Sequence, residues 1–200
     1  MGYSIDSLTE NCYEGTTCLI NKFDIRDDKK LSTIEAIITS AKCSELETHP
    51  IDGGFDFSHY LSIHKYIFED IYTWAGEIRK VSISKKGTNF VSPELISDLA
   101  INVFSSIPNA DFANCGCDKF VDFIADFYDK TNLLHPFREG NGRTQRMFLT
   151  QLIRHFGYNI NFSQIDTDEL MIATIQAANG VRDNLVDIFR KAIILPVDKQ

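Results

Sequence analysis

Apolar side chains recur at intervals of three and four positions along most of the chain, which is the spacing that gathers them on one face of a helix. This pattern predicts six or seven helices. The predicted helices begin near Asp27 or Asp28, Asp56, Ser92, Asp118, Gly142, Asp166 and Asp183. Most of these positions carry a short polar side chain of the kind that caps a helix N-terminus.

The first two predicted helices carry apolar stripes that we expect to face the core. In the first helix the stripe consists of Leu31, Ile34, Ile37, Ile38 and Ala41. In the second it consists of Phe57, Leu61, Ile67, Phe68 and Ile71 and includes His64. We interpret His64 as a core histidine rather than a catalytic one, because it shares the apolar face.

The period changes after Gly76. Val81 and Ile83 on one side and Phe90 and Val91 on the other flank a polar run, which predicts a β-hairpin over residues 81–91 with an exposed tip. The expected fold class is therefore all-α with a small β appendage. Without linkers or repeats, residues 1–200 are expected to form a single domain with an N-terminal arm over residues 1–28.

Composition excludes several classes of function. The chain has 200 residues, 44% of them hydrophobic, which is typical of a globular domain. A net charge of −8 argues against nucleic acid as a partner. No apolar run is long enough to span a membrane, and the first residues lack the pattern of a signal peptide. The five cysteines are odd in number and scattered, which favours reduced thiols, so we expect a cytoplasmic location without a membrane partner.

One segment, residues 135–146 with the sequence HPFREGNGRTQR, concentrates groups that carry chemistry. Gly140 and Gly142 let the backbone approach a ligand closely and lead into a helix N-terminus, whose free N–H groups favour an anion. Arg143 and Arg146 lie three apart and share one helix face. In an acidic protein, this concentration of positive charge predicts a phosphate site.

Two further side chains refine that hypothesis. Glu139 would repel phosphates unless a divalent cation lay between them, so its presence predicts Mg²⁺ bound together with a nucleotide. His135 can act as a general base at neutral pH. We expect Phe137 to fix the loop to the core and Arg138 to point into solvent. The alternative is an ordinary helix–loop–helix turn in which the glycines serve geometry and the arginines serve solubility.

The segment resembles the signature of the Fic family, His-Pro-Phe-x-(Asp/Glu)-Gly-Asn-Gly-Arg-x-x-Arg, and matches it at every fixed position. The resemblance extends over nearly the whole chain. Residues 13–25 look like the family's N-terminal arm, residues 63–76 look like the helix before its hairpin, and the hairpin looks like its flap. The resemblance implies a Fic-like helical domain with residues 135–146 as its catalytic loop.

The resemblance also implies an activity, the transfer of AMP from ATP to a hydroxyl side chain of a target protein. By this analogy His135 deprotonates the hydroxyl and Glu139 holds Mg²⁺. The family's nucleotide contacts correspond to Gly140, Asn141, Gly142, Arg143 at the β-phosphate, Arg146 at the γ-phosphate and, near the adenine, Asn179. Family members with lysine in place of Gly142 resemble kinases, so the glycine favours AMP transfer.

The flap and the control of activity follow from the same analogy. The flap backbone at Ile83, Ser84, Lys85 and Lys86 would align the target by strand addition. The family's inhibitory pattern, (Ser/Thr)-x-x-x-Glu-(Gly/Asn), has no clean copy, since residues 6–11 carry Asp6 at the Ser/Thr position. We therefore expect a toxin restrained by a separate antitoxin that supplies a glutamate to Arg146. The remaining alternatives are transfer of another phosphate-containing group and a nonenzymatic regulator that senses ATP.

Overall fold

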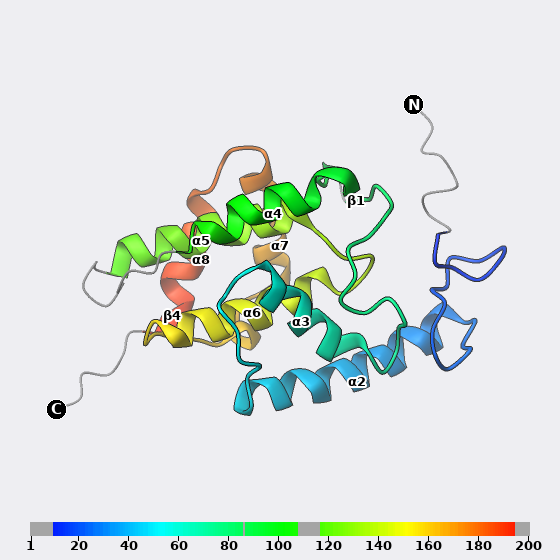
Figure 1. Ribbon diagram of the computed structural model, residues 1–200. Coiled ribbons are helices and arrows are strands. Elements are labelled where there is room, and N and C mark those ends of the chain that lie inside the picture. Colours follow the sequence, from blue (N-terminus) through cyan, green and yellow to red (C-terminus); the bar gives the residue numbers. More distant parts are fainter. Residues whose placement is uncertain (1–9, 86, 108–116, 195–200) are drawn as a thin grey trace.

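The computed structural model describes residues 10–85, 87–107 and 117–194, and within them it confirms the predicted helical fold. The helices are α2 (Asp28–Thr48), α3 (Phe57–Phe68), α4 (Ile96–Ser105), α5 (Cys117–Leu134), α6 (Asn141–His155), α7 (Thr167–Ala178) and α8 (Asp183–Ala192) (Figure 1). Short 3-10 turns cover Pro93–Leu95 and Phe162–Gln164. Among these residues no helix has both the length and the apolar character that crossing a membrane requires.

Asp27, Asp56 and Asp166 cap their helices as predicted, whereas Ser92 forms no side-chain cap bond and α8 has none either. The carboxylate of Asp27 accepts a hydrogen bond from the main-chain N–H of Lys30 at the start of α2. Asp56 caps α3 in the same way. At the start of α7, Asp166 accepts from two successive N–H groups, each at 2.9 Å. These bonds satisfy donors that have no acceptor inside the helix, so they fix where each helix begins.

Two pairs of very short strands accompany the helices. The predicted hairpin is present as β1 (Ser84–Lys85) and β2 (Thr88–Asn89), antiparallel, with Ser84 opposite Asn89. A second pair, β3 (Asn159–Ile160) with β4 (Ile193–Ile194), joins the end of α6 to the end of α8. The sequence did not predict this second pair, because two residues are too few to show an alternating pattern.

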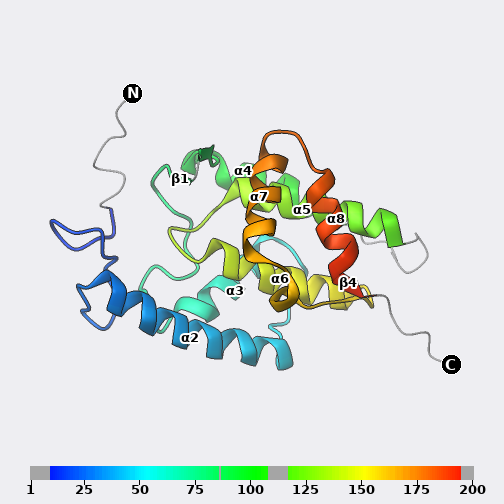
Figure 2. The same ribbon diagram turned by 180° about the vertical axis from the view of Figure 1, so that it is seen from behind.

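Helix α6 is the structural centre of the molecule. It packs against α2, α3 and α5, and in Figure 2 it runs behind α7 between these neighbours. Most of its side chains are buried, including the run from Met147 to Ile153. Phe148 lies at the heart of the core, in ring contact with Tyr60, Phe104 and Phe127. A helix packed on several sides holds its N-terminus rigidly, and that terminus belongs to the 135–146 segment.

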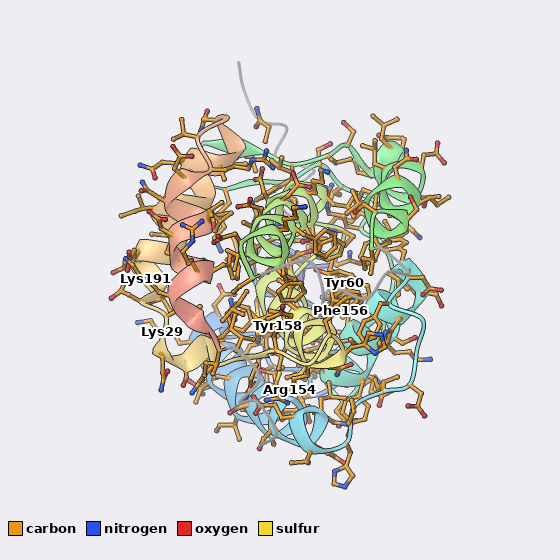
Figure 3. All side chains as sticks on the ribbon, turned by 90° about the vertical axis from the view of Figure 1, so that its left-hand side faces the viewer. Lys29, Tyr60, Arg154, Phe156, Tyr158 and Lys191 are labelled. Carbon is orange, nitrogen blue, oxygen red and sulfur yellow. The ribbon has the colours of Figure 1, made fainter. Side chains whose placement is uncertain are left out.

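Side chains on the helices divide between the interior and the outer surface. Figure 3 shows Tyr60 and Tyr158 among the helices, while Lys29 and Lys191 project from the outer surface. His64 is fully buried, as the sequence predicted.

The predicted apolar stripe of α2 is partly wrong. Leu31 is buried, but Ile37 is 65% exposed and Ala41 is exposed as well. The helix instead buries the polar side chains of Glu35 and Thr39. The physical reason is that α2 packs against the charged N-terminal turn of α6, where Arg143 needs polar partners. Some predicted residues, namely 1–9, Lys86 and Cys115, lie outside the described part of the chain.

Candidate active site

The 135–146 segment turns the chain between α5 and α6. The main-chain N–H of His135 still bonds to the Thr131 carbonyl at 3.2 Å, in the manner of a last helical turn. His135 itself has a φ of 41°, a conformation that non-glycine residues adopt rarely. Gly140, with a φ of 82°, then starts α6. A strained histidine at the head of a loop is the kind of backbone feature that concentrates at functional sites.

Phe137 fixes the middle of the loop, as predicted. Its side chain is fully buried and stacks on the imidazole of His64 at a centroid distance of 3.7 Å. The side-chain amide of Asn141 braces the same residue from the other side. Its oxygen accepts from the N–H of Phe137 at 2.9 Å, and its nitrogen donates to the Phe137 carbonyl at 2.8 Å. In this structure Asn141 therefore holds the loop closed.

His64 links three parts of the site. Its Nδ1 accepts the main-chain N–H of Gly76 at 2.8 Å, so Nε2 carries the proton and donates to the Glu139 carbonyl at 3.0 Å. Burial lowers the pKa of His64 to about 3, which keeps the ring neutral and preserves this pattern. The residue joins α3, the approach to the flap and the loop without contributing a charge.

His135 is arranged as a base. Its Nδ1 lies 3.1 Å from the carbonyl oxygen of Asn132, which can only accept, so Nδ1 carries the proton and Nε2 keeps its lone pair. Burial, followed by the nearby cations Arg79 and Lys85, lowers its pKa to about 4. The ring of Phe90 stacks on it at 3.7 Å and fixes its plane. A neutral, oriented imidazole can accept a proton at physiological pH.

Arg79 ties the flap to this histidine, and the sequence analysis missed it. Its Nε donates to the His135 carbonyl at 2.7 Å, and its Nη1 and Nη2 donate to the carbonyls of Val81 and Val91. Its own N–H bonds to the Pro136 carbonyl at 2.8 Å. The side chain is buried, which lowers its pKa to about 10, so it stays charged at neutral pH. One guanidinium thus holds both ends of the hairpin against the loop.

The N-terminal turn of α6 has the features that favour an anion. The main-chain N–H groups of residues 141–143 have no acceptor within the helix, because they belong to its first turn. Arg146 is half-buried one turn further along, and its guanidinium forms no hydrogen bond or ion pair with any residue that the structure describes. Free donors at the positive end of a helix dipole, together with an unpaired guanidinium, attract phosphate.

Glu139 alone offers too few oxygens to bind a metal ion, so phosphate oxygens of a nucleotide would have to complete the coordination. Its Oε1 accepts from the N–H of Gly140 at 2.8 Å and from Nη2 of Arg143 at 3.1 Å, while Oε2 is left without such a bond to the described residues. Those residues contain no cluster of three or more side chains of the metal-binding types. A single free carboxylate oxygen fits the way Mg²⁺ binds, through one or two carboxylates plus phosphate oxygens.

Arg143 is held by a carboxylate that sequence reasoning did not find. Its Nη2 lies 2.6 Å from Oε1 of Glu35, and its Nη1 lies 3.2 Å from Oγ1 of Thr39. The guanidinium also lies over the ring of Phe68 at 4.7 Å. The sequence did contain a sign of this contact, because Glu35 and Thr39 are one helical turn apart and share a helix face with Leu31.

The remaining predicted site residues lie outside the 135–146 segment, on the flap and at the end of α7. Ser84 and Lys85 are exposed on the flap. Asn179, also exposed, ends α7 and donates its side-chain N–H to the Ile175 carbonyl at 2.7 Å, so its contact with adenine stays a prediction. The expectation for Arg138 was wrong. It is half-buried, and its Nε lies 3.4 Å from the carbonyl oxygen of Glu10.

Comparison with known proteins agrees with this geometry. The model of the Fic/DOC family matches residues 54–153, which contain α3, the flap, the 135–146 segment and all but the last two residues of α6. The chain belongs to the Fic/DOC family. Among its relatives is the probable protein adenylyltransferase y4lH of Sinorhizobium fredii, 34% identical over 84% of this chain and 88% of the relative.

Two further comparisons extend over most of the chain. The protein adenylyltransferase VbhT of Bartonella schoenbuchensis is 32% identical over 88% of this chain, which corresponds to 37% of VbhT. The crystal structure of the BepC protein of Bartonella tribocorum with bound AMPPNP matches with a TM-score of 0.85 at 25% identity, over 96% of this chain and 99% of that one. The helical fold with its flap is therefore a Fic fold.

Gly140 provides a test of the packing beneath the loop. A Cβ at this residue would lie 2.2 Å from Cζ of Phe68, whereas Gly157 has the same sign of φ, 83°, and no atom within 4 Å. Both alanine variants carry the cost of a positive φ, but only Gly140→Ala adds a clash. We expect it to lower the free energy of unfolding by about 1–3 kcal/mol more than Gly157→Ala does, measured by urea denaturation. Equal losses would contradict the proposed packing.

The lowered pKa values of His64 and His135 predict how stability depends on pH. In the unfolded chain both rings titrate near 6.5, whereas in the folded chain they stay neutral until about pH 3 and pH 4 respectively. Below pH 6.5 the unfolded state therefore binds protons that the folded state does not, and the free energy of unfolding falls as the pH drops toward 4. Urea denaturation across this range and NMR titration of the ring signals measure both effects. A His135 ring that titrates at 6.5 in the folded protein would contradict the assignment.

Proposed function

We propose that this Fic protein transfers AMP from ATP to a hydroxyl side chain of a target protein. The observation that carries the proposal is the position of His135, a neutral base with a free Nε2, at the head of a loop that ends in a cationic helix N-terminus. The names of two relatives, the probable protein adenylyltransferase y4lH and the protein adenylyltransferase VbhT, support the same reaction.

In the proposed reaction His135 takes the proton of the target hydroxyl at Nε2. The hydroxyl oxygen attacks the α-phosphorus of ATP, the bond from that phosphorus to the bridging oxygen breaks, and pyrophosphate leaves with the bonding electrons. The main-chain carbonyl of Asn132 keeps Nδ1 protonated throughout, so it stabilises the imidazolium that forms. Mg²⁺, when bound at Glu139 with the phosphates, supplies charge neutralisation.

The nucleotide phosphates would lie over the first turn of α6. The N–H groups of residues 141–143 face them, Arg143 contacts the β-phosphate and Arg146 contacts the γ-phosphate. Gly142 leaves room for the Arg146 guanidinium in this position. A Cβ at residue 142 would approach Nη1 of Arg146 to 3.2 Å and crowd the guanidinium. We extend the site to Asn179 for adenine, following the resemblance alone.

The target segment would add to the flap as a strand. Among the residues that the structure describes, hairpin β1–β2 consists of these two strands, so the backbone of Ser84 and Lys85 offers an outer edge to an extended peptide. Arg79 holds both ends of this hairpin on the loop that carries His135. A hydroxyl on the added segment would therefore be delivered at a fixed distance from the base.

A separate antitoxin that supplies a glutamate to Arg146 completes the proposal. In the described part of the chain no carboxylate pairs with Arg146. Of the nearest sequence to an inhibitory pattern, residues 6–11, only Glu10 and Asn11 are described. The main-chain carbonyl of Glu10 accepts a hydrogen bond from Nε of Arg138, and no ion pair between its carboxylate and Arg146 occurs among the described residues. This arrangement favours inhibition by another chain, as expected for a toxin in the cytoplasm.

Radiolabelled ATP tests the reaction class. With label on the α-phosphate, the protein and Mg²⁺ should transfer radioactivity to protein in a lysate, and label on the γ-phosphate should not transfer. His135→Ala should reduce transfer by about 100-fold or more while ATP binding persists, because the base alone is lost. Transfer from the γ-phosphate would indicate a kinase. Tight binding without any transfer would favour the ATP-sensing regulator.

Substitution of Glu10 tests the source of inhibition. If a separate chain supplies the inhibitory glutamate, Glu10→Gly should leave the rate of self-labelling with α-labelled ATP unchanged. Arg146→Ala serves as the positive control and should weaken ATP binding, because it removes the unpaired cation on α6. Strong activation by Glu10→Gly would show that the chain inhibits itself.

A further inference from the structure

Glu35 is a buried charge on a helix whose neighbouring residues face solvent. It lies on α2, and its carboxylate reaches the N-terminal turn of α6 to pair with Arg143 at 2.6 Å. The two residues are 108 positions apart in sequence. Burying a carboxylate is costly unless it is paired, so a solitary buried glutamate on a helix that is largely exposed indicates a specific use.

Glu35 is itself held from a second side. The hydroxyl of Tyr72 donates to its other oxygen, Oε2, and the almost completely buried ring of Tyr72 stacks on Phe68 and Trp74. Thr39, one turn further along α2, accepts from Nη1 of Arg143. The carboxylate therefore has both oxygens occupied, and Arg143 is bound on the side of its guanidinium that faces α2.

The two carboxylates on Arg143 differ in exposure. The side chain of Glu35 is 11% exposed, whereas that of Glu139 is 47% exposed and lies farther from Nη2, at 3.1 Å. An exposed ion pair contributes little and is readily exchanged for another ligand, but breaking a buried pair leaves an uncompensated charge. When ATP and Mg²⁺ arrive, Arg143 can leave Glu139 far more easily than it can leave Glu35.

We propose that Glu35 is a positioning residue of the nucleotide site, which holds Arg143 against α2 so that its remaining N–H groups face the phosphates and Glu139 becomes free. This inference rests on the proposed function only in that ATP is the ligand. Five N–H donors allow the guanidinium to keep Glu35 and Thr39 and still offer bonds outward. Fixing it in advance reduces the entropy lost on binding.

The sign of the effect separates positioning from simple electrostatics. Removing the negative charge of Glu35 makes the site more positive, so Coulomb attraction alone would tighten the binding of ATP. Loss of the positioning contact would weaken it, because Arg143 would become mobile and would pair more closely with Glu139. The direction of the change in ATP affinity therefore decides between the two.

The experiment measures ATP affinity by isothermal titration calorimetry with Mg²⁺, in the His135→Ala background so that no transfer occurs. We expect Glu35→Met, which keeps the volume but removes the charge, to weaken binding about tenfold. In a background that also carries Arg143→Met, the same substitution should add almost nothing, because Glu35 acts only through Arg143. Glu35→Gln, which retains an oxygen acceptor, should recover much of the affinity.

Glu45→Met is the matched control. Glu45 lies on the same helix and is exposed, and its carboxylate, like that of Glu35 toward Tyr72, raises the pKa of a neighbouring tyrosine, Tyr66. The Glu45→Met substitution should leave ATP affinity unchanged. If Glu35→Met does not fold, Glu35→Gln in the two backgrounds gives the same test with a smaller expected loss.

Three results would overturn the inference. These are tighter or unchanged binding by Glu35→Met, an equal loss with and without Arg143, and an equal loss for Glu45→Met. Failure of the proposed function looks different. In that case the unaltered protein binds ATP but transfers no AMP, and the dependence of affinity on Glu35 remains measurable.

Discussion

The burial of Phe137 against His64 fixes the geometry on which the rest of the site depends. The stacked ring holds the middle of the loop in the core, and the two hydrogen bonds of His64 set the loop's distance from α3 and from the approach to the flap. Because this support is apolar and neutral, it adds no charge beside the proposed phosphate site. His135 and the first turn of α6 are then held on either side of a fixed point.

The charges around that point are arranged so that a base and an anion site can lie side by side. His135 stays neutral through burial and through the cations near it, so it does not compete for phosphate. Arg146 is left unpaired by the described residues, and Arg143 is shared between a buried and an exposed carboxylate. Positioning and charge neutralisation dominate catalysis of transfer reactions at phosphorus, and this layout provides both.

The sequence predicted those parts of the site that lie close together along the chain. The 135–146 segment stands out in the sequence because base, carboxylate, glycines and arginines all occur within these twelve residues. Glu35 and Arg79 were missed because their partners are distant in sequence, and only folding brings α2 and the hairpin base to the loop. The predicted apolar stripe of α2 was partly wrong for the same reason, because the inward face of this helix carries the polar side chains that contact Arg143. The pairing of β3 with β4 could not be predicted either, because each strand has only two residues and shows no alternating pattern.

The most direct test of the account is a crystal structure of the protein with Mg²⁺ and a nonhydrolysable ATP analogue. We expect the phosphates over the N–H groups of residues 141–143, with the α-phosphorus facing Nε2 of His135 and Arg143 still paired with Glu35. A nucleotide bound elsewhere, or an α-phosphorus turned away from that nitrogen, would contradict it.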